Sequence, residues 1–234
     1  MSLMNPMITF NCPKCGDIHK ENIEIYSDNL RKQSFKIAPI LPTCLLCGSE
    51  IIVNRSNMNN SDCKVIVLTG TCGSGKSSTA EILMQHEFGV IDGDCVMQVV
   101  KHKLGVNKIK FDEPSMYEEM ENEIDILLAL KKNIVISNVI TSQDIQIYRK
   151  IFKQRKLNYK VFLLQPQYIF AIERTKTRTC HKSITPEEWV KYFYDELSIF
   201  EKQENEDVII FDNSYYSVEE SVNVILKIYE KLFN

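Results

Sequence analysis

The feature that most constrains the fold is a glycine-rich octapeptide at residues 70–77, Gly-Thr-Cys-Gly-Ser-Gly-Lys-Ser. It follows an apolar, β-branched run at 65–69 and precedes a segment at 78–84 that we expect to be helical. In a strand-loop-helix unit of this kind, backbone N–H groups and the helix N-terminus can surround a phosphate. The pattern Gly-x-x-x-x-Gly-Lys-Ser therefore predicts a site for a nucleoside triphosphate, which we take to be ATP. The residues expected to bind it are Gly70, Thr71, Cys72, Gly73, Ser74, Gly75, Lys76, Ser77 and Ser78.

The last two residues of the octapeptide have separate expected roles. Lys76 would reach the β- and γ-phosphates, and the Ser77 hydroxyl would bind Mg²⁺. A glycine- and serine-rich turn that matches by chance is the alternative. All fixed positions and both flanking elements are present, which favours the phosphate-binding loop.

The chain from residue 63 onward alternates apolar runs with helix-length segments. This alternation predicts an α/β domain, with a parallel sheet of about five strands and helices on both faces. The expected strands are 65–69, 89–92, 134–138, 159–164 and 207–211. Helix starts are expected at three capping boxes, Ser115 with Glu118, Thr185 with Glu188, and Ser217 with Glu220.

Length and charge narrow the class of protein. The 234 residues fit one α/β domain at 63–234, a small module at 1–55 and a polar linker at 56–62. The formal charge of -3 gives no case for binding duplex nucleic acid by the chain as a whole. No apolar run has the length of a membrane span and no signal-peptide pattern opens the chain, so we expect no membrane contact. The eight cysteines, four of them in two pairs and four scattered, suit a metal site in a reducing cytoplasm better than a disulfide framework.

The N-terminal module contains two Cys-x-x-Cys pairs. Cys12 and Cys15 form the first, and Cys44 and Cys47 form the second after 28 intervening residues. Two such turns can complete a tetrahedral thiolate shell, so the four cysteines are predicted to bind Zn²⁺. The pattern resembles a zinc ribbon. A four-cysteine iron site and a redox dithiol remain alternatives.

The role expected for this module is that of a structural cap or a general interaction surface. A closed four-cysteine zinc site lacks the open coordination position that catalysis requires. Docking of a protein or nucleic-acid partner is the functional alternative.

A pair of carboxylates follows the second expected strand. Asp92-Gly93-Asp94 lies at a carboxyl end of the sheet, where ligands bind in such folds. One carboxylate can face Mg²⁺ and the other an acceptor hydroxyl. A surface turn or a helix N-cap formed by Asp94 is the structural alternative.

With these features, residues 63–234 resemble the small P-loop kinases related to nucleoside monophosphate, shikimate, adenylylsulfate and antibiotic kinases. The resemblance implies that Asp94 orients or deprotonates the acceptor and that Asp92 helps to hold Mg²⁺. It also implies that Arg174 and Arg178 belong to a mobile lid that closes over the phosphates, and that the loop at Asp212 packs near the adenine. The alternatives are a solvated helical face for the arginines and a plain turn for Asp212.

Two absences refine this hypothesis. The third expected strand ends in Ser137-Asn138 and lacks the acid of a Walker B motif. This absence favours Asp92 as the residue that takes the role of that acid, and it disfavours a motor-type ATPase. No arginine occurs between Gly93 and Tyr148, the expected acceptor flank. Because arginine is the preferred partner of phosphate and carboxylate, a neutral hydroxyl compound is favoured as acceptor, although lysines in this stretch weaken the argument.

Two further expectations concern apolar side chains. The acceptor flank could be lined by apolar or aromatic residues, and core packing explains the same residues equally well: Met97, Val100, Phe111, Met116 and Tyr117. Trp189 is expected to be a partly buried helix residue.

The function that these features favour is ATP- and Mg²⁺-dependent transfer of the γ-phosphoryl group to a hydroxyl of a small molecule. A nucleoside, nucleotide, sugar or antibiotic-like compound could be the acceptor. One alternative is a nucleic-acid end kinase that uses the zinc ribbon as a clamp. The other is a nucleotide-binding switch with little transfer activity.

Overall fold

The computed structural model describes the backbone of residues 8–11 and 18–21, and then residues 63–106, 114–129, 132–177, 187–202 and 205–233. The N-terminal strands β1 (Ile8–Asn11) and β2 (Ile18–Glu21) pair antiparallel. The predicted zinc ligands Cys12, Cys15, Cys44 and Cys47 lie outside the described residues, as do the linker at 56–62 and Arg178. Those assignments stay predictions.

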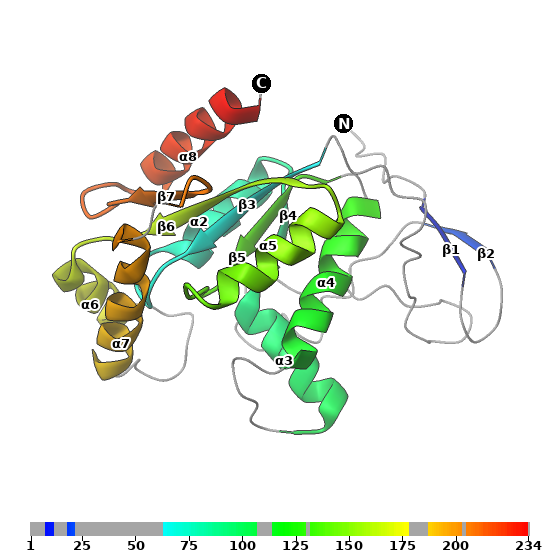
Figure 1. Ribbon diagram of the computed structural model, residues 1–234, viewed down its shortest axis with the longest axis horizontal. Coiled ribbons are helices and arrows are strands. Elements are labelled where there is room, and N and C mark those ends of the chain that lie inside the picture. The colour runs from blue at the N-terminus through cyan, green and yellow to red at the C-terminus, as the bar shows by residue number, and fades with distance from the viewer. Residues whose placement is uncertain are drawn as a thin grey trace.

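A parallel five-stranded sheet organises the rest of the chain (Figure 1). Its strand order is β4-β5-β3-β6-β7, so the strand that leads into the glycine-rich loop lies at the centre. The strands are β3 (Lys64–Thr69), β4 (Gly89–Asp92), β5 (Ile134–Ser137), β6 (Asn158–Leu164) and β7 (Val208–Phe211). The predicted α/β class and parallel sheet are confirmed.

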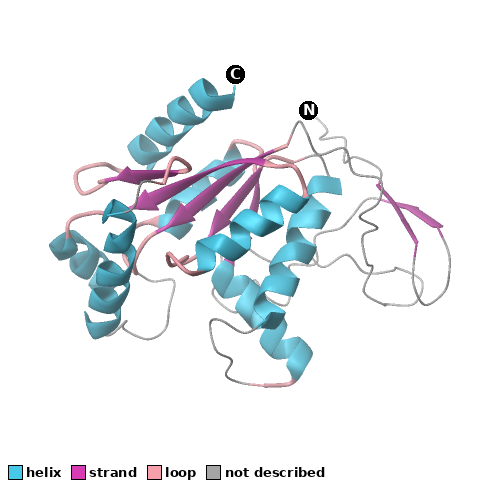
Figure 2. Ribbon diagram, viewed as in Figure 1, coloured by secondary structure: helices cyan, strands magenta, loops and turns pink. Residues whose placement is uncertain are grey.

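Helices cover both faces of the sheet and one end of it (Figure 2). One face carries α2 (Lys76–Gln85) and α8 (Val218–Phe233). The other carries α3 (Gly93–Leu104), α4 (Pro114–Ala129) and α5 (Asp144–Gln154). Beyond the carboxyl ends of the strands lie α6 (Tyr168–Thr177) and α7 (Glu187–Leu197), followed by the short 3₁₀ helix η2 (Ser198–Lys202).

Successive strand residues enter the two cores in alternation. On β3, Ile66 and Leu68 pack in the core on the α2 side, whereas Val65 and Val67 pack in the core under α4 and α5. Side chains alternate in direction along a strand, and both faces of this sheet are covered by helices. This explains why the strand segments are almost uninterrupted apolar runs in the sequence.

The expected strands agree with the observed ones to within one residue at each end. Of the capping boxes, Ser217–Glu220 is confirmed, because Glu220 N–H donates to Ser217 Oγ at 3.1 Å and Ser217 N–H to the Glu220 carboxylate at 2.8 Å. The box at Ser115 is wrong, since α4 already includes Pro114 and the Ser115 hydroxyl has no hydrogen-bond partner among the described residues. Thr185 lies outside the described residues.

Trp189 is a second correction. Its side chain is 57% exposed rather than partly buried. It lies in the first turn of α7, a helix that turns Val190 and Leu197 toward the protein interior. Within the described ranges, no helix has both the length and the apolar character needed to span a membrane.

Candidate nucleotide-binding and phosphoryl-transfer site

The glycine-rich loop joins β3 to α2 at the carboxyl edge of the sheet, as predicted. Gly73 and Gly75 have φ values of +80° and +95°, in the left-handed region that favours glycine. A Cβ on Gly73 would lie 2.2 Å from the carbonyl oxygen of Ala171 on α6. The glycine therefore serves both the backbone conformation of the loop and its close approach to α6.

The Lys76 ammonium is folded back over this loop. Nζ donates to the carbonyl oxygens of Gly70 at 2.7 Å and Thr71 at 2.9 Å. The ammonium is thereby held close to the backbone of the loop. A phosphate that entered the loop would contact both the ammonium and the backbone N–H groups.

Two buried contacts tie the loop to elements far away in the sequence. The Thr71 hydroxyl donates to the carbonyl oxygen of Val190 on α7 at 2.9 Å. The Asn213 side-chain amide, after β7, donates to the carbonyl oxygen of Ser74 at 2.9 Å. Sequence analysis predicted neither contact, because no local sequence pattern identifies a partner more than a hundred residues away.

The second-strand acid lies beside the start of α2. Ser77 Oγ donates to Asp92 Oδ2 at 3.3 Å, while Asp92 Oδ1 accepts from the backbone N–H groups of Asp94 at 3.0 Å and Cys95 at 3.3 Å. Burial, followed by the charge of Asp94, raises the pKa of Asp92 to about 6, and the two backbone hydrogen bonds oppose this rise. The N-cap of α3 is therefore Asp92, whereas the structural alternative had assigned a cap to Asp94. Asp94 lies half-buried in the first turn of the helix.

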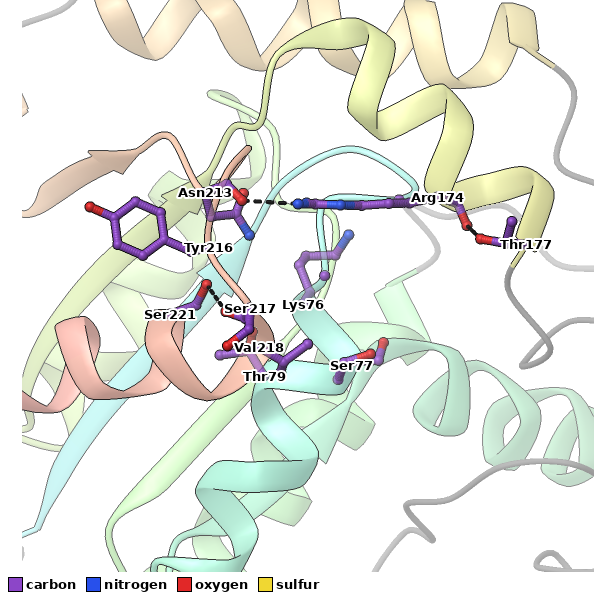
Figure 3. Close-up of a pocket in the computed structure, with 13 residues that line it drawn as sticks. Lys76, Ser77, Thr79, Arg174, Thr177, Asn213, Tyr216, Ser217, Val218 and Ser221 are labelled. Carbon is purple, nitrogen blue, oxygen red and sulfur yellow. Dashed lines mark hydrogen bonds between the residues drawn. The ribbon is translucent and has the colours of Figure 1, made fainter.

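Arg174 reaches from α6 toward the loop after β7. Its Nη2 donates to the carbonyl oxygen of Asn213 at 2.9 Å (Figure 3) and to that of Ser214 at 3.0 Å. The guanidinium thus bridges α6 and the loop after β7 while lining the same cavity as Lys76. Its expected partner Arg178 follows the end of α6, outside the described residues.

Asp212 shapes the loop after β7. Its carboxylate accepts from the Ser214 backbone N–H at 2.9 Å and from the Ser214 hydroxyl, and the side chain is otherwise turned to solvent. The neighbouring residue Asn213 lines the cavity instead. A turn that begins with aspartate holds its own backbone in this way.

These elements enclose a cavity of about 380 Å³ (Figure 3). Its volume is in the range of pockets that hold small ligands. From the predicted loop it takes Gly73, Gly75, Lys76, Ser77 and Ser78, and from α6 it takes Arg174. Residues that sequence analysis missed complete it: Thr79, Thr177, Asn213, Tyr216, Ser217, Val218 and Ser221. The capping box at Ser217 marked the start of α8 but not its closeness to the glycine-rich loop.

A separate indentation opens on the other face of the sheet, at the end of β5. It is lined by polar groups of Asn138, Asp144 and Tyr117 and by Met116 and Met120. The Tyr117 hydroxyl donates to Asp144 at 2.8 Å. A Cβ on Gly93 would lie 2.3 Å from Asn138 Oδ1, which means that this indentation adjoins the Asp92-Gly93-Asp94 segment.

The expected apolar lining of the acceptor flank is found only in part. Met116 and Tyr117 border the indentation, whereas Val100 is fully packed in the core and Phe111 lies outside the described residues. The nearest arginines in the sequence stabilise the scaffold. Arg149 pairs with Asp207 and Arg155 with Asp125.

The donor set suits a magnesium ion that arrives with a nucleotide. Among the described residues, no group of three His, Cys, Asp or Glu side chains could hold a metal ion by itself. Mg²⁺ is usually bound by one or two protein ligands together with phosphate oxygens and water. The Ser77 hydroxyl and the Asp92 carboxylate, in contact with each other, match that need.

Strand order, the loop after the central strand β3 and Asp92 at the end of β4 define an α/β fold with a glycine-rich loop at the carboxyl edge of its parallel sheet. Solved structures share it at low sequence identity. A gluconokinase from Sinorhizobium meliloti 1021 aligns with 75% of this chain and 98% of its own, at 18% identity and a TM-score of 0.52. The tunicamycin resistance protein of Deinococcus radiodurans aligns with 71% of this chain and 95% of its own, at 17% identity and a TM-score of 0.55.

A third structure, a sugar kinase from Janibacter sp. HTCC2649, aligns with 72% of this chain and 95% of its own, at 14% identity and a TM-score of 0.53. No protein-family model matches the sequence, and no curated protein matches it. The likeness therefore establishes the fold, and function has to be argued from the site.

Proposed function

We propose that the protein is a kinase that uses ATP and Mg²⁺ to phosphorylate a hydroxyl group of a small molecule. The observation that supports this most is the 3.3 Å contact between Ser77 Oγ and Asp92 Oδ2. It joins the phosphate-binding loop to the acidic segment that borders the second indentation. A nucleotide bound at the loop and an acceptor bound beside Asp94 would then meet at one edge of the sheet.

In the proposed reaction, an oxygen of the acceptor hydroxyl attacks the γ-phosphorus of ATP and the bond to the β,γ-bridging oxygen breaks. Asp94 orients the hydroxyl and takes up its proton. Lys76, Arg174 and Arg178 stabilise the negative charge on the transferring oxygens and on the departing ADP. Mg²⁺, held by Ser77 and Asp92, supplies further neutralisation of the phosphate oxygens when bound.

The acceptor is proposed to be a nucleoside, nucleotide, sugar or antibiotic-like compound, with preference for one that lacks an anionic group. Asp94 and Asp144 bring negative charge to this side, and the described residues 93–106, 114–129 and 132–148 contain no arginine. A phosphate or carboxylate on the acceptor would find no bidentate partner among them.

The test is an ATP-consumption screen with the full chain across nucleosides, nucleotides, sugars, antibiotics and oligonucleotides. Lys76→Ala serves as the blank, because removal of the ammonium should lower turnover by at least about a hundredfold. A compound consumed by the wild-type protein and not by the variant identifies the acceptor class. If no compound raises consumption above the blank, the kinase assignment is wrong. Consumption with oligonucleotides alone would favour the end-kinase alternative.

For the N-terminal part we propose a zinc-ribbon-like module at 1–55, with Zn²⁺ bound by Cys12, Cys15, Cys44 and Cys47, and a linker at 56–62. The spacing of the two cysteine pairs supports this. Its partner is proposed to be either the kinase-like domain itself or a protein or nucleic-acid ligand.

A further inference from the structure

One buried polar group beside the nucleotide site has no assigned task. Ser137, the last residue of β5, is 2% exposed, and its hydroxyl has no hydrogen-bond partner among the described residues. A buried hydroxyl without a partner is unfavourable, so its presence calls for a physical reason.

The sheet register determines where this hydroxyl lies. Ser137 is the register partner of Asp92 on β4 and of Leu68 on β3, the residue two positions before the glycine-rich loop. Partners in neighbouring parallel strands project to the same face of the sheet. Leu68 belongs to the core on the α2 side, and so Ser137 and Asp92 both project toward α2.

The α2 side is also where Ser77 meets Asp92. Asp92 Oδ1 is occupied by two backbone N–H groups of α3, which leaves Oδ2, shared with Ser77, as the oxygen that faces the loop. Ser137 lies between the loop strand and the Asp92 strand at the same level of the sheet. Ser137 therefore neighbours Asp92 on the face of the sheet where Asp92 contacts Ser77, the second residue of α2.

We propose that Ser137 is a positioning residue for the Mg²⁺ that accompanies the nucleotide, its hydroxyl accepting a hydrogen bond from a water molecule of the ion's hydration shell. The inference rests on the proposed function, since it assumes that a Mg²⁺-nucleotide complex binds at the loop. Mg²⁺ keeps several of its waters when bound to proteins, and these waters need oriented acceptors.

A hydroxyl suits this position better than a second carboxylate. Asp92 is already buried close to Asp94, and another negative charge beside it would oppose ionisation of Asp92. Serine provides an acceptor for water without that charge. Two residues then take the place of the missing Walker B acid: Asp92 supplies the negative charge, and Ser137 orients a water molecule of the ion.

The test measures binding of a non-hydrolysable ATP analogue by calorimetry, at increasing Mg²⁺ concentrations and in EDTA. Ser137→Ala should lower the affinity at saturating Mg²⁺ by roughly five- to tenfold, the usual worth of one hydrogen bond, and change the affinity in EDTA by less than about twofold. Ser137→Thr, which keeps the hydroxyl, should restore most of the Mg²⁺ effect.

Ser115→Ala is the matched control, because the Ser115 hydroxyl is also buried without a described partner but lies on α4, on the opposite face of the sheet. It should change neither affinity. Unchanged melting temperatures without nucleotide would show that both alanine variants are folded. The inference fails if Ser137→Ala binds like wild type in Mg²⁺, or weakens binding equally in Mg²⁺ and EDTA. If wild-type binding ignores Mg²⁺ altogether, the inference and the proposed function fail together.

Discussion

At the scale of single residues, Asp92 joins two helices through its two carboxylate oxygens. One carboxylate oxygen caps α3 through the backbone N–H groups of Asp94 and Cys95, and the other contacts Ser77. The cap fixes the orientation of the carboxylate and leaves its other oxygen beside the loop, where we propose that Mg²⁺ binds. The carboxylate stays buried near Asp94 at a cost that appears in its raised pKa.

This cost predicts a pH dependence of stability. With a folded pKa of about 6 against an ordinary 3.8, native Asp92 holds its proton where the unfolded chain has lost it. The contribution of Asp92 to the free energy of unfolding is therefore full below pH 4. It declines by about 3 kcal/mol as the pH rises to about 6. Asp92→Asn keeps a capping oxygen and removes the titration. In Mg²⁺-free denaturation between pH 4 and pH 8, the variant should gain stability relative to wild type across that window. A difference that does not vary with pH would contradict the assignment.

Asp94 should behave differently from a structural residue. If it accepts the proton of the acceptor hydroxyl, Asp94→Asn should lower kcat by about 10²- to 10⁴-fold and leave ATP affinity nearly unchanged. Steady-state kinetics with the acceptor found in the screen, together with calorimetric ATP binding, would check this. Equal losses in transfer and ATP binding would point to a purely structural role.

At the scale of elements, the glycine-rich loop is held from three sides. α6 approaches Gly73, α7 accepts from Thr71, and the loop after β7 donates to Ser74. Three elements that are distant in sequence, α6, α7 and the loop after β7, therefore contact the glycine-rich loop directly. We expect substitutions in α6 or α7 to alter the conformation of the glycine-rich loop.

Alanine substitutions at two glycines can distinguish the effect of backbone strain from that of a steric clash. Gly73→Ala puts a methyl group 2.2 Å from the Ala171 carbonyl oxygen at a φ of +80°. Gly105→Ala has a similar φ of +66°, and no atom of the described residues lies within 4 Å of its methyl group. The Gly105 variant should lose about 1 kcal/mol of stability, the usual cost of a left-handed non-glycine residue, and keep ATP binding. Gly73→Ala should lose clearly more and bind ATP at least about tenfold more weakly. Denaturant unfolding and calorimetry measure both effects, and equal behaviour of the two variants would refute the role of the Ala171 contact.

The element predictions succeeded where the signal was local. Alternating apolar runs marked all five strands of the sheet, and Ser217 with Glu220 marked the start of α8. The box at Ser115 failed because α4 already includes Pro114, a residue favoured in the first turn of a helix, so that Ser115 lies within the helix rather than at its cap. Trp189 was misjudged because the helical pattern could not tell which side of α7 faces the protein.

At the scale of the molecule, the chain combines a kinase-like fold with a predicted cysteine module. The full-length protein should contain one zinc ion per chain by elemental analysis, and Cys44→Ser should lose it, because three thiolates hold the ion much less well than four. ATP binding by that variant should stay within about twofold of wild type if the module is only a cap. Iron in place of zinc, or no metal, would revive the alternatives for the four cysteines.

The sequence by itself determined the class of fold, the position of the glycine-rich loop and the acid at the end of the second strand. Each depends on short-range patterns: glycines at fixed spacing, alternating apolar runs and residues that directly follow a strand. Only the tertiary structure decided which oxygen of Asp92 faces Ser77, that Asn213 rather than Asp212 lines the cavity, and that Ser137 shares the face of Asp92. Those facts depend on strand order, register and contacts across more than a hundred residues, which no local pattern specifies.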